Sequence, residues 1–444
     1  MTWLNEAERR QLETLSQLAY CNPFLPERIE WEERVLGAAF TAAPPVWSHR
    51  FDLKASEVNV DRILEITDPL IHGLAERLAG GTKPNAAELT LYEDVALFHL
   101  YHRYRHRFGE TLHKSLKGRP AKFEQWQPFL KDLNRLMAPA RGRTASAEEA
   151  AHLLAGFYQI RRAFENIYYC IVGGSLPAAR LRAAVWQSVF THDLARYRRV
   201  LYARMNDHPT LIIGPSGTGK ELVARAIGLS RYIPFDPESA RFIDDVARAF
   251  TPLNLSALSP TLIESELFGH CRGAFTGAVD DRAGWLEQCP PRGAVFLDEI
   301  GELEAAIQVK LLRVLQTGVF QRLGESRERA FCGKIIAATN RDLAEEMRAG
   351  RFRRDFYYRL CADVVTTPTL HEQLEDNPAD LENLVRHLAG RIAGEAAEDL
   401  AAEVLQWITG SLGRNYPWPG NIRELEQCVR NVMIRREYQP PRPM

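Results

Sequence analysis

Several features that define particular classes of protein are scarce in this 444-residue sequence. No apolar run approaches the roughly 20 residues that a membrane-spanning helix needs, and the N-terminus lacks a signal-peptide pattern. The 7 cysteines are scattered and form no C-x-x-C pair, which argues against a disulfide framework and against a zinc site. A charge excess is also missing, because 56 basic and 57 acidic residues leave a formal net charge of −1. These absences predict a cytoplasmic protein without membrane contact. They also argue against nucleic-acid binding through overall positive charge, although a local basic patch remains open.

The length and the ordinary composition, 45% hydrophobic and 25% charged, predict about three folding units in a globular protein. Residues 1–170 are expected to be a mainly α-helical N-terminal domain, in which Ser146 and Glu149 have the spacing of a capping box. A smaller helical region with a C-terminal tail is expected over residues 366–444.

The middle unit, residues 171–365, alternates short apolar runs with helical patterns. Buried strands are predicted at Thr210–Ile213, Gly293–Leu297 and Lys334–Ala338. Helices are predicted at Glu221–Leu229, Ile307–Gln316 and Asp342–Ala349. This alternation predicts an α/β fold with a parallel sheet that is covered by helices on both faces.

A glycine-rich loop between a predicted strand and a predicted helix is the strongest general motif. It consists of Gly214, Pro215, Ser216, Gly217, Thr218, Gly219 and Lys220. In this context, backbone N–H groups and the helix N-terminus bind phosphate oxygens, and the lysine neutralises the β- and γ-phosphates. The sequence therefore predicts a P-loop for a nucleotide, in preference to a chance Gly-rich turn. Glu221 occupies the position where the general motif has Ser or Thr, so the usual hydroxyl ligand to magnesium is missing.

Polar residues at the ends of two further strands extend this predicted site. Asp298 and Glu299 follow the apolar run Val295–Leu297. We expect Asp298 to hold Mg²⁺, directly or through water, and Glu299 to orient and deprotonate the attacking water. Without the P-loop, an acidic strand end facing solvent would explain the pair equally well. Thr339 and Asn340 end another strand, where a polar side chain can touch the γ-phosphate; Asn340 can also cap a helix from residue 342 onward.

A longer string, Glu264–Ala278, lies between these elements and ends in five small residues around one aromatic residue. The hexapeptide is Gly273, Ala274, Phe275, Thr276, Gly277 and Ala278. By composition it is a mobile contact tip with an exposed Phe275, or a flexible surface loop whose Phe275 is in the core. The whole string resembles the signature of the AAA+ ATPase domain in sigma-54-dependent transcriptional activators, the bacterial enhancer-binding proteins. The resemblance extends over roughly residues 171–436.

The resemblance implies an AAA+ α/β core with a helical lid, Mg²⁺-dependent ATP hydrolysis, and assembly into a ring, which is a hexamer in that family. In the family, the hexapeptide tips a loop that contacts sigma-54 and helps to convert the closed promoter complex into an open one. Glu221 is what the family carries after the P-loop lysine, and Asn254 matches the asparagine that holds the catalytic glutamate. Arg353 and Arg359 match the segment with arginine fingers that reach a neighbouring subunit's γ-phosphate. Arg423 matches the lid arginine that senses nucleotide in cis.

The sequence departs from the family pattern at three places. Pro215 replaces a usually acidic residue, and Pro368–Asp376 lacks the family's Leu-Arg-Glu-Arg. The chain also stops shortly after the lid, where family members usually carry a helix-turn-helix domain. Direct specific DNA binding is therefore not expected.

The N-terminal region lacks a receiver-domain pattern, and its most unusual stretch is Phe98–Phe108, where histidines and arginines alternate with aromatic residues. Together with Glu110, the histidines are compatible with a metal site, and the basic residues with an RNA-binding stripe. The alternative is an amphipathic helix whose polar face meets solvent. That helix would bury Leu97, Tyr101, Tyr104 and Phe108. The interleaved arginines favour the amphipathic helix, because they repel a metal cation.

Together, these features predict an ATP-hydrolysing transcriptional activator that remodels sigma-54 RNA polymerase and is regulated by its N-terminal domain. One alternative is an AAA+ remodeller of another client, which the hexapeptide argues against. The other is an adaptor that joins mixed rings without turnover, which Asp298 and Glu299 argue against.

Overall fold

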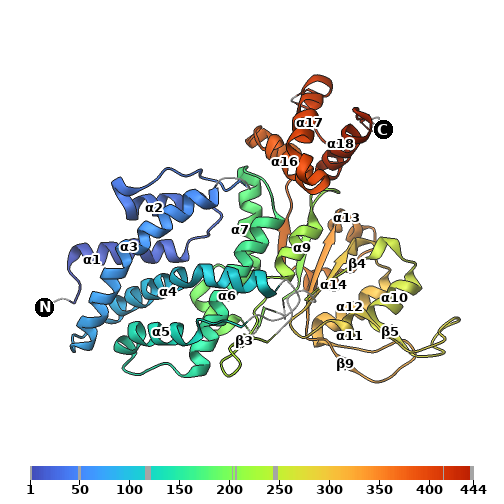
Figure 1. Cartoon of the computed structure of the whole chain (residues 1–444). Coiled ribbons are helices and arrows are strands. Elements are labelled where there is room, and N and C mark those ends of the chain that lie inside the picture. Colours follow the sequence, from blue (N-terminus) through green and yellow to red (C-terminus); the bar gives the residue numbers. More distant parts are fainter. Residues whose placement is uncertain are drawn as a thin grey trace.

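The structure, a computed structural model, describes residues 3–48, 52–115, 122–202, 204–205, 208–243, 249–413 and 415–440. Figure 1 shows three groups of elements: a bundle of N-terminal helices, a sheet with flanking helices, and a small helical lid above them. None of the helices in these ranges is both long and apolar enough to cross a lipid bilayer.

Helices account for most of the first 190 residues. They are α1 (Glu6–Tyr20), α2 (Glu27–Leu36), the 3₁₀ turn η1 (Gly37–Ala39), α3 (Asp52–Ala79), α4 (Ala86–Ser115), α5 (Trp126–Arg141), α6 (Ala147–Cys170) and α7 (Leu176–Phe190). The capping box predicted at the start of α6 is confirmed. Ser146 Oγ accepts the backbone N–H of Glu149 at 3.2 Å, and the Glu149 carboxylate accepts the N–H of Ser146 at 3.0 Å. The reciprocal pair satisfies two N–H groups that have no partner within the helix, and so defines where α6 begins.

Helix α4 is covered on more sides than expected, because only part of its polar face meets solvent. The four apolar residues predicted to face the core do so: Leu97, Tyr104 and Phe108 are buried and Tyr101 is half-buried. His99 and Arg105 are buried as well, because α3 packs against their side of the helix. Arg105 is neutralised there by Asp61, with 2.6 Å between Nη2 and Oδ1. Arg103, His106 and Arg107 stay exposed, so the polar face of α4 is partly covered by α3 and partly open to solvent.

The middle unit is built on a five-stranded parallel sheet. In spatial order its strands are β11 (Asp363–Thr366), β1 (Thr210–Ile213), β10 (Lys334–Thr339), β7 (Ala294–Asp298) and β4 (Phe250–Asn254). The three strands that the sequence predicted are confirmed to within a residue or two at each end. Because all neighbouring strands run parallel, their carboxyl ends share one edge, where open α/β sheets bind ligands.

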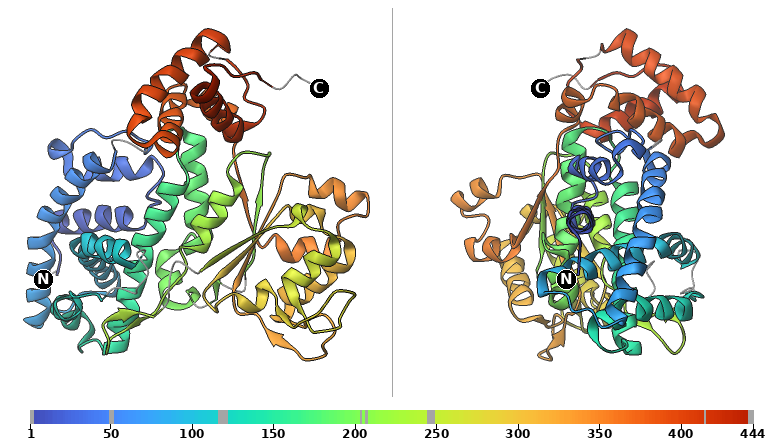
Figure 2. Two further views of the ribbon diagram at one scale, coloured as in Figure 1. Left: turned by 45° about the vertical axis from the view of Figure 1, so that its right-hand side comes forward. Right: turned by 90° about the vertical axis from the view of Figure 1, so that its left-hand side faces the viewer.

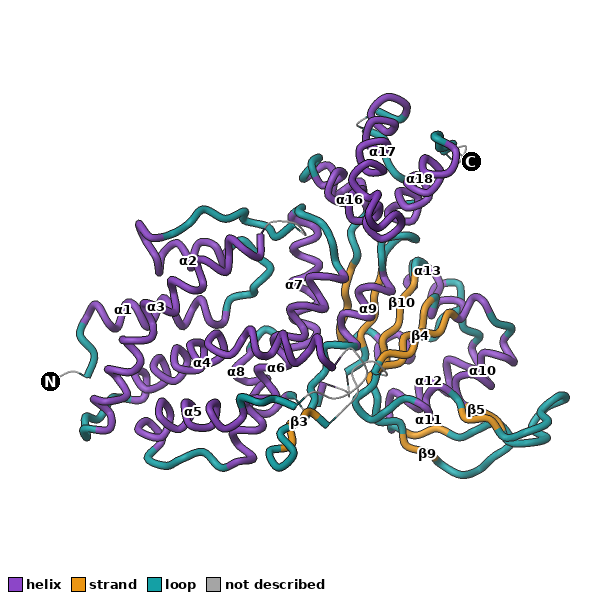
Figure 3. Tube along the Cα trace, in the orientation of Figure 1, coloured by secondary structure: helices purple, strands orange, loops and turns teal. Residues whose placement is uncertain are grey.

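Helices and short hairpins surround this sheet (Figure 3). The helices are α8 (Leu194–Arg196), the π-helical turn η2 (Tyr197–Leu201), α9 (Lys220–Gly228), the 3₁₀ turn η5 (Leu255–Ala257), α10 (Pro260–Phe268), α11 (Trp285–Gln288), the 3₁₀ turn η6 (Ile300–Glu302), α12 (Ala305–Thr317), α13 (Leu343–Arg348) and α14 (Arg354–Leu360). The hairpins pair β2 (Phe235–Asp236) with β3 (Arg241–Phe242), β5 (Gly269–His270) with β6 (Arg282–Ala283), and β8 (Val319–Phe320) with β9 (Arg329–Ala330).

Side chains along each strand alternate between two hydrophobic cores, as the two-residue period of a strand requires. Val295 and Leu297 of β7 join the core with α10, α12 and α14, whereas Phe296 joins the core with α7 and α9. The second core also contains Ile167 of α6, so the N-terminal bundle and the sheet share one packed interior. Because this interior is closely packed, a displacement of α6 also shifts β1 and α9, the elements on either side of the P-loop.

The lid contains α15 (Leu370–Asp376), α16 (Asp380–Ala393), the 3₁₀ turn η7 (Gly394–Ala396), α17 (Ala397–Ser411) and α18 (Asn421–Arg435). Figure 2 shows it above α7 and α9. The stretch at Pro368–Asp376, which departs from the family pattern, is ordered by a capping box of its own between Thr369 and Glu372. Asp376 Oδ2 then accepts the N–H of Leu176 at 2.7 Å, which joins the lid to the start of α7.

Candidate functional site

The P-loop glycines meet two segments that leave no room for a side chain. Gly214 and Gly217 have φ angles of 152° and 80°. A Cβ atom on Gly214 would lie 2.1 Å from Thr367 Oγ1, and one on Gly217 would lie 2.3 Å from the carbonyl oxygen of Gly420. Glycine is required at both positions by the close approach as well as by the backbone conformation. The loop therefore depends on its contacts with the end of β11 and with the lid.

Lys220 begins α9, and its ammonium group is held against the loop that precedes it. Nζ donates to the carbonyl oxygen of Gly214 at 3.0 Å and to that of Pro215 at 3.1 Å. Burial lowers the pKa of Lys220, while the carboxylates of Glu299 and Asp298 act in the opposite direction. A buried cation with only carbonyl partners suits an anionic ligand, because phosphate oxygens make stronger, charge-assisted hydrogen bonds.

The two acidic residues reach the same edge of the sheet from β7. Asp298 Oδ1 accepts the N–H of Glu299 at 3.1 Å. Glu299 itself lies in the left-handed region, with φ 58° and ψ 49°, a conformation that costs a non-glycine residue about 1–2 kcal/mol. Its Oε2 accepts the N–H of Asn340 at 3.4 Å, so the ends of β7 and β10 are joined at the predicted site. Strain of this kind is concentrated at functional sites.

Two other predicted residues lie close to this edge. Thr339 is buried, pairs in register with Ile213 just before the P-loop, and accepts the N–H of Arg341 at 3.1 Å. Asn340 is exposed and does not cap α13, which corrects that interpretation: Asp342 Oδ1 accepts the N–H of Ala344 at 2.8 Å instead. The shorter reach from Asp342 to the free N–H groups of the first turn decides between the two residues.

Asn254 and Glu221 also flank the site, and neither side chain makes a hydrogen bond with the acidic pair among the described residues. Asn254 is paired in register with Asp298, but its Oδ1 accepts the N–H of Ser256 at 3.0 Å and the Ser256 hydroxyl at 2.8 Å. A hydrogen bond between Asn254 and Glu299, which the resemblance implies, is absent from the described residues. The local turn to Ser256 satisfies the asparagine side chain first. Glu221 lies in the first turn of α9 and is exposed.

The first turn of α18 in the lid rests directly on the P-loop. Arg423 Nη1 donates to Ser216 Oγ at 3.0 Å, and the N–H of Ile422 donates to the carbonyl oxygen of Gly217 at 3.0 Å. Asn421 is buried in the left-handed conformation and links three segments. Its Nδ2 donates to the carbonyl oxygen of Ser216 at 3.0 Å, and its Oδ1 accepts the N–H of Leu370 at 2.9 Å.

Asn421 and Thr367 are structural members of this site that the sequence reasoning missed. Thr367 is buried, and its hydroxyl lies 2.7 Å from that of Thr218 in the P-loop. Both residues lie next to segments that the resemblance identified. The sequence carries no local signal for their contacts, because their partners in the P-loop are far away in the sequence.

The two candidate arginine fingers differ in how they are held. Arg353 directly precedes α14 and forms a two-pronged ion pair with Asp355, with 3.0 Å from Nε to Oδ1 and 2.7 Å from Nη2 to Oδ2. Arg359, in the last turn of α14, is exposed and makes no ion pair with any described residue. Both lie on the surface of the core, where a guanidinium group can reach a second molecule.

The Gly273–Ala278 hexapeptide forms a closed turn in the long loop between β5 and β6. The N–H of Gly273 donates to the carbonyl oxygen of Ala278 at 2.8 Å. Phe275 is half-buried and meets the His270 ring edge-on at 5.0 Å between centroids, so it is neither fully exposed nor part of the core. Thr276 and Gly277 are exposed at the tip. Figures 1 and 3 show this loop projecting on the side opposite the N-terminal bundle.

The histidine-rich part of α4 contributes one residue to a cluster that could hold a metal ion. Asp68 and His72 of α3 and His99 of α4 place one ligand atom each within 4.8 Å of one another. His102, His106 and Glu110, which the sequence suggested as ligands, are not in it. Arg103 Nη1 lies 3.8 Å from Asp68 Oδ1, and its positive charge opposes a dication there. We therefore assign no metal to this cluster.

The residues at the sheet edge fit a nucleoside triphosphate and its metal. The loop supplies a cradle that a side chain on Gly214 or Gly217 would fill, and Lys220 supplies the cation. Asp298 Oδ2 makes no hydrogen bond with any described residue, so one carboxylate oxygen is available to Mg²⁺, which prefers oxygen ligands.

Comparison with known proteins shows what the chain is similar to. The family model described as the sigma-54 interaction domain matches residues 189–366, and that of the AAA+ ATPase lid domain matches residues 375–440. The Nif-specific regulatory protein of Azotobacter vinelandii is 44% identical over 230 residues, which are 51% of this chain and 40% of that protein. The anaerobic nitric oxide reductase transcription regulator NorR of Salmonella paratyphi C is 42% identical over 231 residues, covering 52% of this chain and 42% of the relative.

A crystal structure of NtrX from Brucella abortus has a TM-score of 0.44 and 27% identity, and covers 67% of this chain and 62% of that one. The matched segment spans about two fifths of the length of the curated relatives.

Proposed function

The matches over residues 189–366 and 375–440 place this chain in the AAA+ family of sigma-54-dependent transcriptional activators, and we propose its function from that premise. In this proposal the chain hydrolyses ATP to remodel sigma-54 RNA polymerase from a closed to an open promoter complex. One observation carries the proposal. The P-loop, the acidic pair and the lid arginine meet at one sheet edge, while the hexapeptide projects from the same core as a separate contact.

Each residue at the sheet edge has a role in this proposal. Lys220 exchanges its carbonyl partners for the β- and γ-phosphate oxygens of ATP. Glu299 takes a proton from the attacking water at its carboxylate, which the N–H of Asn340 helps to orient. Asp298 holds Mg²⁺, which supplies neutralisation of phosphate charge when bound. Arg423 passes from Ser216 to the nucleotide, so that the lid responds to what the P-loop holds.

Ring assembly completes the site in this proposal: Arg353 and Arg359 are exposed on the surface of the core and act on a neighbouring subunit. An arginine supplied in trans stabilises charge in the transition state and makes turnover depend on assembly. ATP turnover per subunit is therefore expected to rise with protein concentration. A specific activity that stays constant from dilute to concentrated protein would contradict fingers supplied in trans.

The client is tested at the exposed tip of the hexapeptide. Thr276→Ala is expected to leave ATP turnover close to wild type and to abolish open-complex formation by sigma-54 RNA polymerase. Thr276→Ser keeps the hydroxyl and serves as the matched control. If the Thr276→Ala variant still supports promoter opening, the chain acts on another client. If the wild-type chain fails to hydrolyse ATP at any concentration, the chain is instead a non-hydrolysing adaptor.

A further inference from the structure

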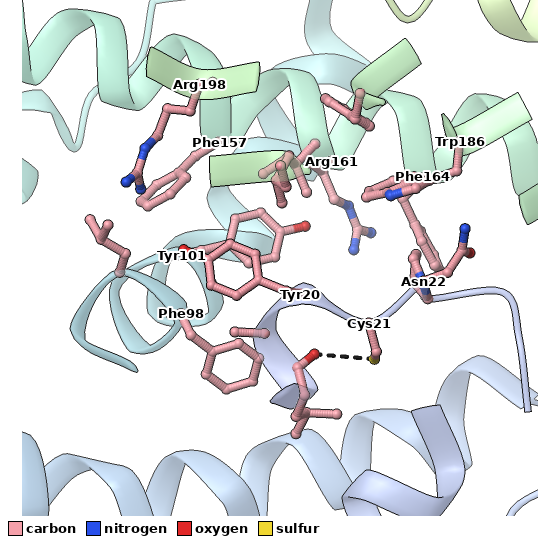
Figure 4. A pocket seen from close by; sticks show the side chains of 18 of the residues that line it. Tyr20, Cys21, Asn22, Phe98, Tyr101, Phe157, Arg161, Phe164, Trp186 and Arg198 are labelled. Atoms are coloured by element: carbon pink, nitrogen blue, oxygen red, sulfur yellow. Dashed lines mark hydrogen bonds between the residues drawn. The ribbon is translucent and has the colours of Figure 1, made fainter. Parts of the chain in front are cut away.

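A cavity of about 320 Å³ lies where the N-terminal bundle meets the start of the matched domain. Figure 4 shows the residues around it: Tyr20, Cys21 and Asn22 from the end of α1, Phe98 and Tyr101 from α4, and Phe157, Arg161 and Phe164 from α6. Trp186 of α7 and Arg198 of η2 also line the cavity, on the same side as Phe157 and Phe164. The space thus belongs to both regions, and it is separate from the P-loop, none of whose residues lines it.

A glycine in the middle of α6 keeps part of this cavity open. Gly156 lines the cavity, and a Cβ atom added to it would meet no atom within 4 Å. Glycine inside a helix lowers stability relative to alanine, and no close approach of another segment requires it at this position. The missing side chain leaves room for an occupant.

The walls of the cavity are suited to an aromatic ring. Phe98, Tyr101, Phe164 and Trp186 present ring faces or edges around it, and the Tyr101 and Phe157 rings already meet edge-on at 5.6 Å between centroids. Aromatic side chains of this kind bind a flat apolar ligand through stacking and edge contacts.

The charges that line the cavity leave one guanidinium group for an anion. Among the charged groups that are not exposed, Glu32 is held by Arg28, and Asp94 by Tyr20. Arg161 is paired with Glu165 at 2.6 Å. Arg198 is half-buried and makes no ion pair with any described residue. A carboxylate on the ligand would satisfy it with charge-assisted hydrogen bonds.

Hydrogen bonds connect this cavity to the helix that begins with Lys220. His152 of α6 donates from Nε2 to the carbonyl oxygen of Arg198 at 2.9 Å, which leaves Nδ1 to accept the Tyr232 hydroxyl at 2.8 Å. Further along α6, Arg162 donates to the carbonyl oxygens of Leu229 and Arg231, at the carboxyl end of α9. Helix α6 therefore lines the cavity and also caps the P-loop helix.

We propose that this cavity is an effector site for a small aromatic carboxylate, and that its occupancy changes ATP turnover through α6 and α9. The second half of this statement rests on the proposed function; binding itself does not. The ring occupies the space beside Gly156, and the carboxylate pairs with Arg198.

Binding is tested on the full chain with 2-naphthoate as the probe and neutral 2-naphthamide as its matched control. Trp47 and Trp186 line the cavity, so their fluorescence reports occupancy. The expected result is saturable binding of 2-naphthoate with a Kd below about 1 mM, and binding of the amide weaker by about tenfold. Arg198→Gln is expected to remove the preference for the acid while leaving amide binding unchanged. Absence of saturable naphthoate binding by the wild-type chain would overturn the assignment.

The location is tested by filling the cavity. Gly156→Leu places a side chain in the open space and is expected to abolish naphthoate binding without loss of helix content by circular dichroism. Gly73→Leu is the control, because Gly73 lies inside α3, also has no atom within 4 Å of its Cβ position, and does not line the cavity. Unchanged naphthoate binding by Gly156→Leu would overturn the location.

Coupling is tested by measuring ATP turnover with and without saturating 2-naphthoate. We expect a change of about fivefold or more in the wild-type chain and none in Gly156→Leu. Naphthoate binding without measurable ATP hydrolysis would contradict the proposed function and leave the effector site intact. ATP hydrolysis that ignores bound naphthoate would overturn the coupling alone.

Discussion

Arg423 in the lid donates a hydrogen bond from Nη1 to Ser216 Oγ in the P-loop, 3.0 Å away and 207 residues earlier in the chain. The contact joins the P-loop, which would hold the phosphates, to the lid, which would move when the bound nucleotide changes. It also places a guanidinium group within a side chain's length of the site without any partner subunit.

Replacing this arginine should separate nucleotide sensing from folding. Arg423→Ala is expected to lower kcat for ATP by about tenfold or more, because a charged hydrogen bond to the ligand is lost. Arg430→Ala, on the same helix but paired with Glu426, is the matched control and should retain wild-type turnover. Equal steady-state rates for the two variants would contradict a role for Arg423 at the nucleotide.

The contact of Gly217 with Gly420 predicts a substitution that loosens the lid. Gly217→Ala combines a positive φ with a Cβ atom 2.3 Å from the Gly420 carbonyl oxygen, so the melting temperature should fall and nucleotide binding should be lost. Gly350→Ala shares the positive φ, at 74°, but meets no atom within 4 Å, and should cost only about 1–2 kcal/mol. Similar melting temperatures for both variants would show that the lid is not tightly docked.

Mixing two inactive variants tests whether the finger acts across subunits. Arg359→Ala keeps Glu299 but lacks the finger, and Glu299→Gln keeps the finger but lacks the base. Arg359→Ala should lose roughly 10³-fold or more of its ATP turnover, the effect of a missing arginine finger, and Glu299→Gln about 10²-fold to 10⁴-fold, the effect of a missing general base. Mixed rings should recover part of it, because some sites then combine an intact Glu299 with a neighbour's Arg359.

Mixtures of Arg359→Ala with Lys220→Ala provide a second such pair. If no mixture regains activity, the finger does not act in trans.

The two fingers should also differ in their dependence on a local partner. Asp355→Asn removes the ion pair that holds Arg353 and leaves Arg359 untouched. If Arg353 must leave Asp355 to reach a neighbour, this variant should increase turnover at low protein concentration, measured as kcat against subunit concentration. A decrease would show that Asp355 positions Arg353 for its role.

His102, a half-buried histidine that lines the cavity, predicts a pH dependence of stability. Burial lowers the pKa of His102 to about 3, and the nearby positive charge of Arg105 adds to the effect. An unfolded chain has an imidazole pKa of about 6.5, so below that pH the unfolded state binds a proton that the folded state does not. The contribution of His102 to the free energy of unfolding is therefore fully present above about pH 6.5. It is lost as the pH falls, by at most about 1.4 kcal/mol per pH unit.

Urea denaturation at pH 7.5 and pH 5.5 measures this contribution. Between the two pH values, the free energy of unfolding of His102→Gln should fall by about 1 kcal/mol less than that of the wild-type chain. The exposed His371→Gln is the control and should follow the wild type. Identical pH dependence in all three proteins would contradict a neutral His102 in the folded chain.

The strands β1, β7 and β10, the P-loop and the acidic pair could be predicted because their signals are local. An apolar run followed by glycines and a lysine, or by two carboxylates, is readable within about ten residues, and each run ended where predicted to within a residue or two. Strands β4 and β11 contain too few consecutive apolar residues to be predicted from an apolar run. Their place in the sheet comes from pairing with β7 and β1.

The surroundings of α4 could not be predicted by the same reasoning. Periodicity identified the helix and its apolar face, but α3 covers the opposite side, so His99 and Arg105 are buried as well. A helical pattern states which residues share a face, and only packing states how many faces are covered.

By itself the sequence determined the chemistry of this protein: a phosphate loop, an acidic pair, a family hexapeptide and a helical N-terminal region, each recognised from neighbouring residues. The tertiary structure alone decided how these parts are connected. It placed Arg423 on Ser216, Thr367 on Thr218, and α6 between a cavity and the P-loop helix. The physical reason is the range of the forces. Backbone propensities and motifs act over a few residues, whereas close packing and hydrogen bonds join partners that the chain separates by up to two hundred.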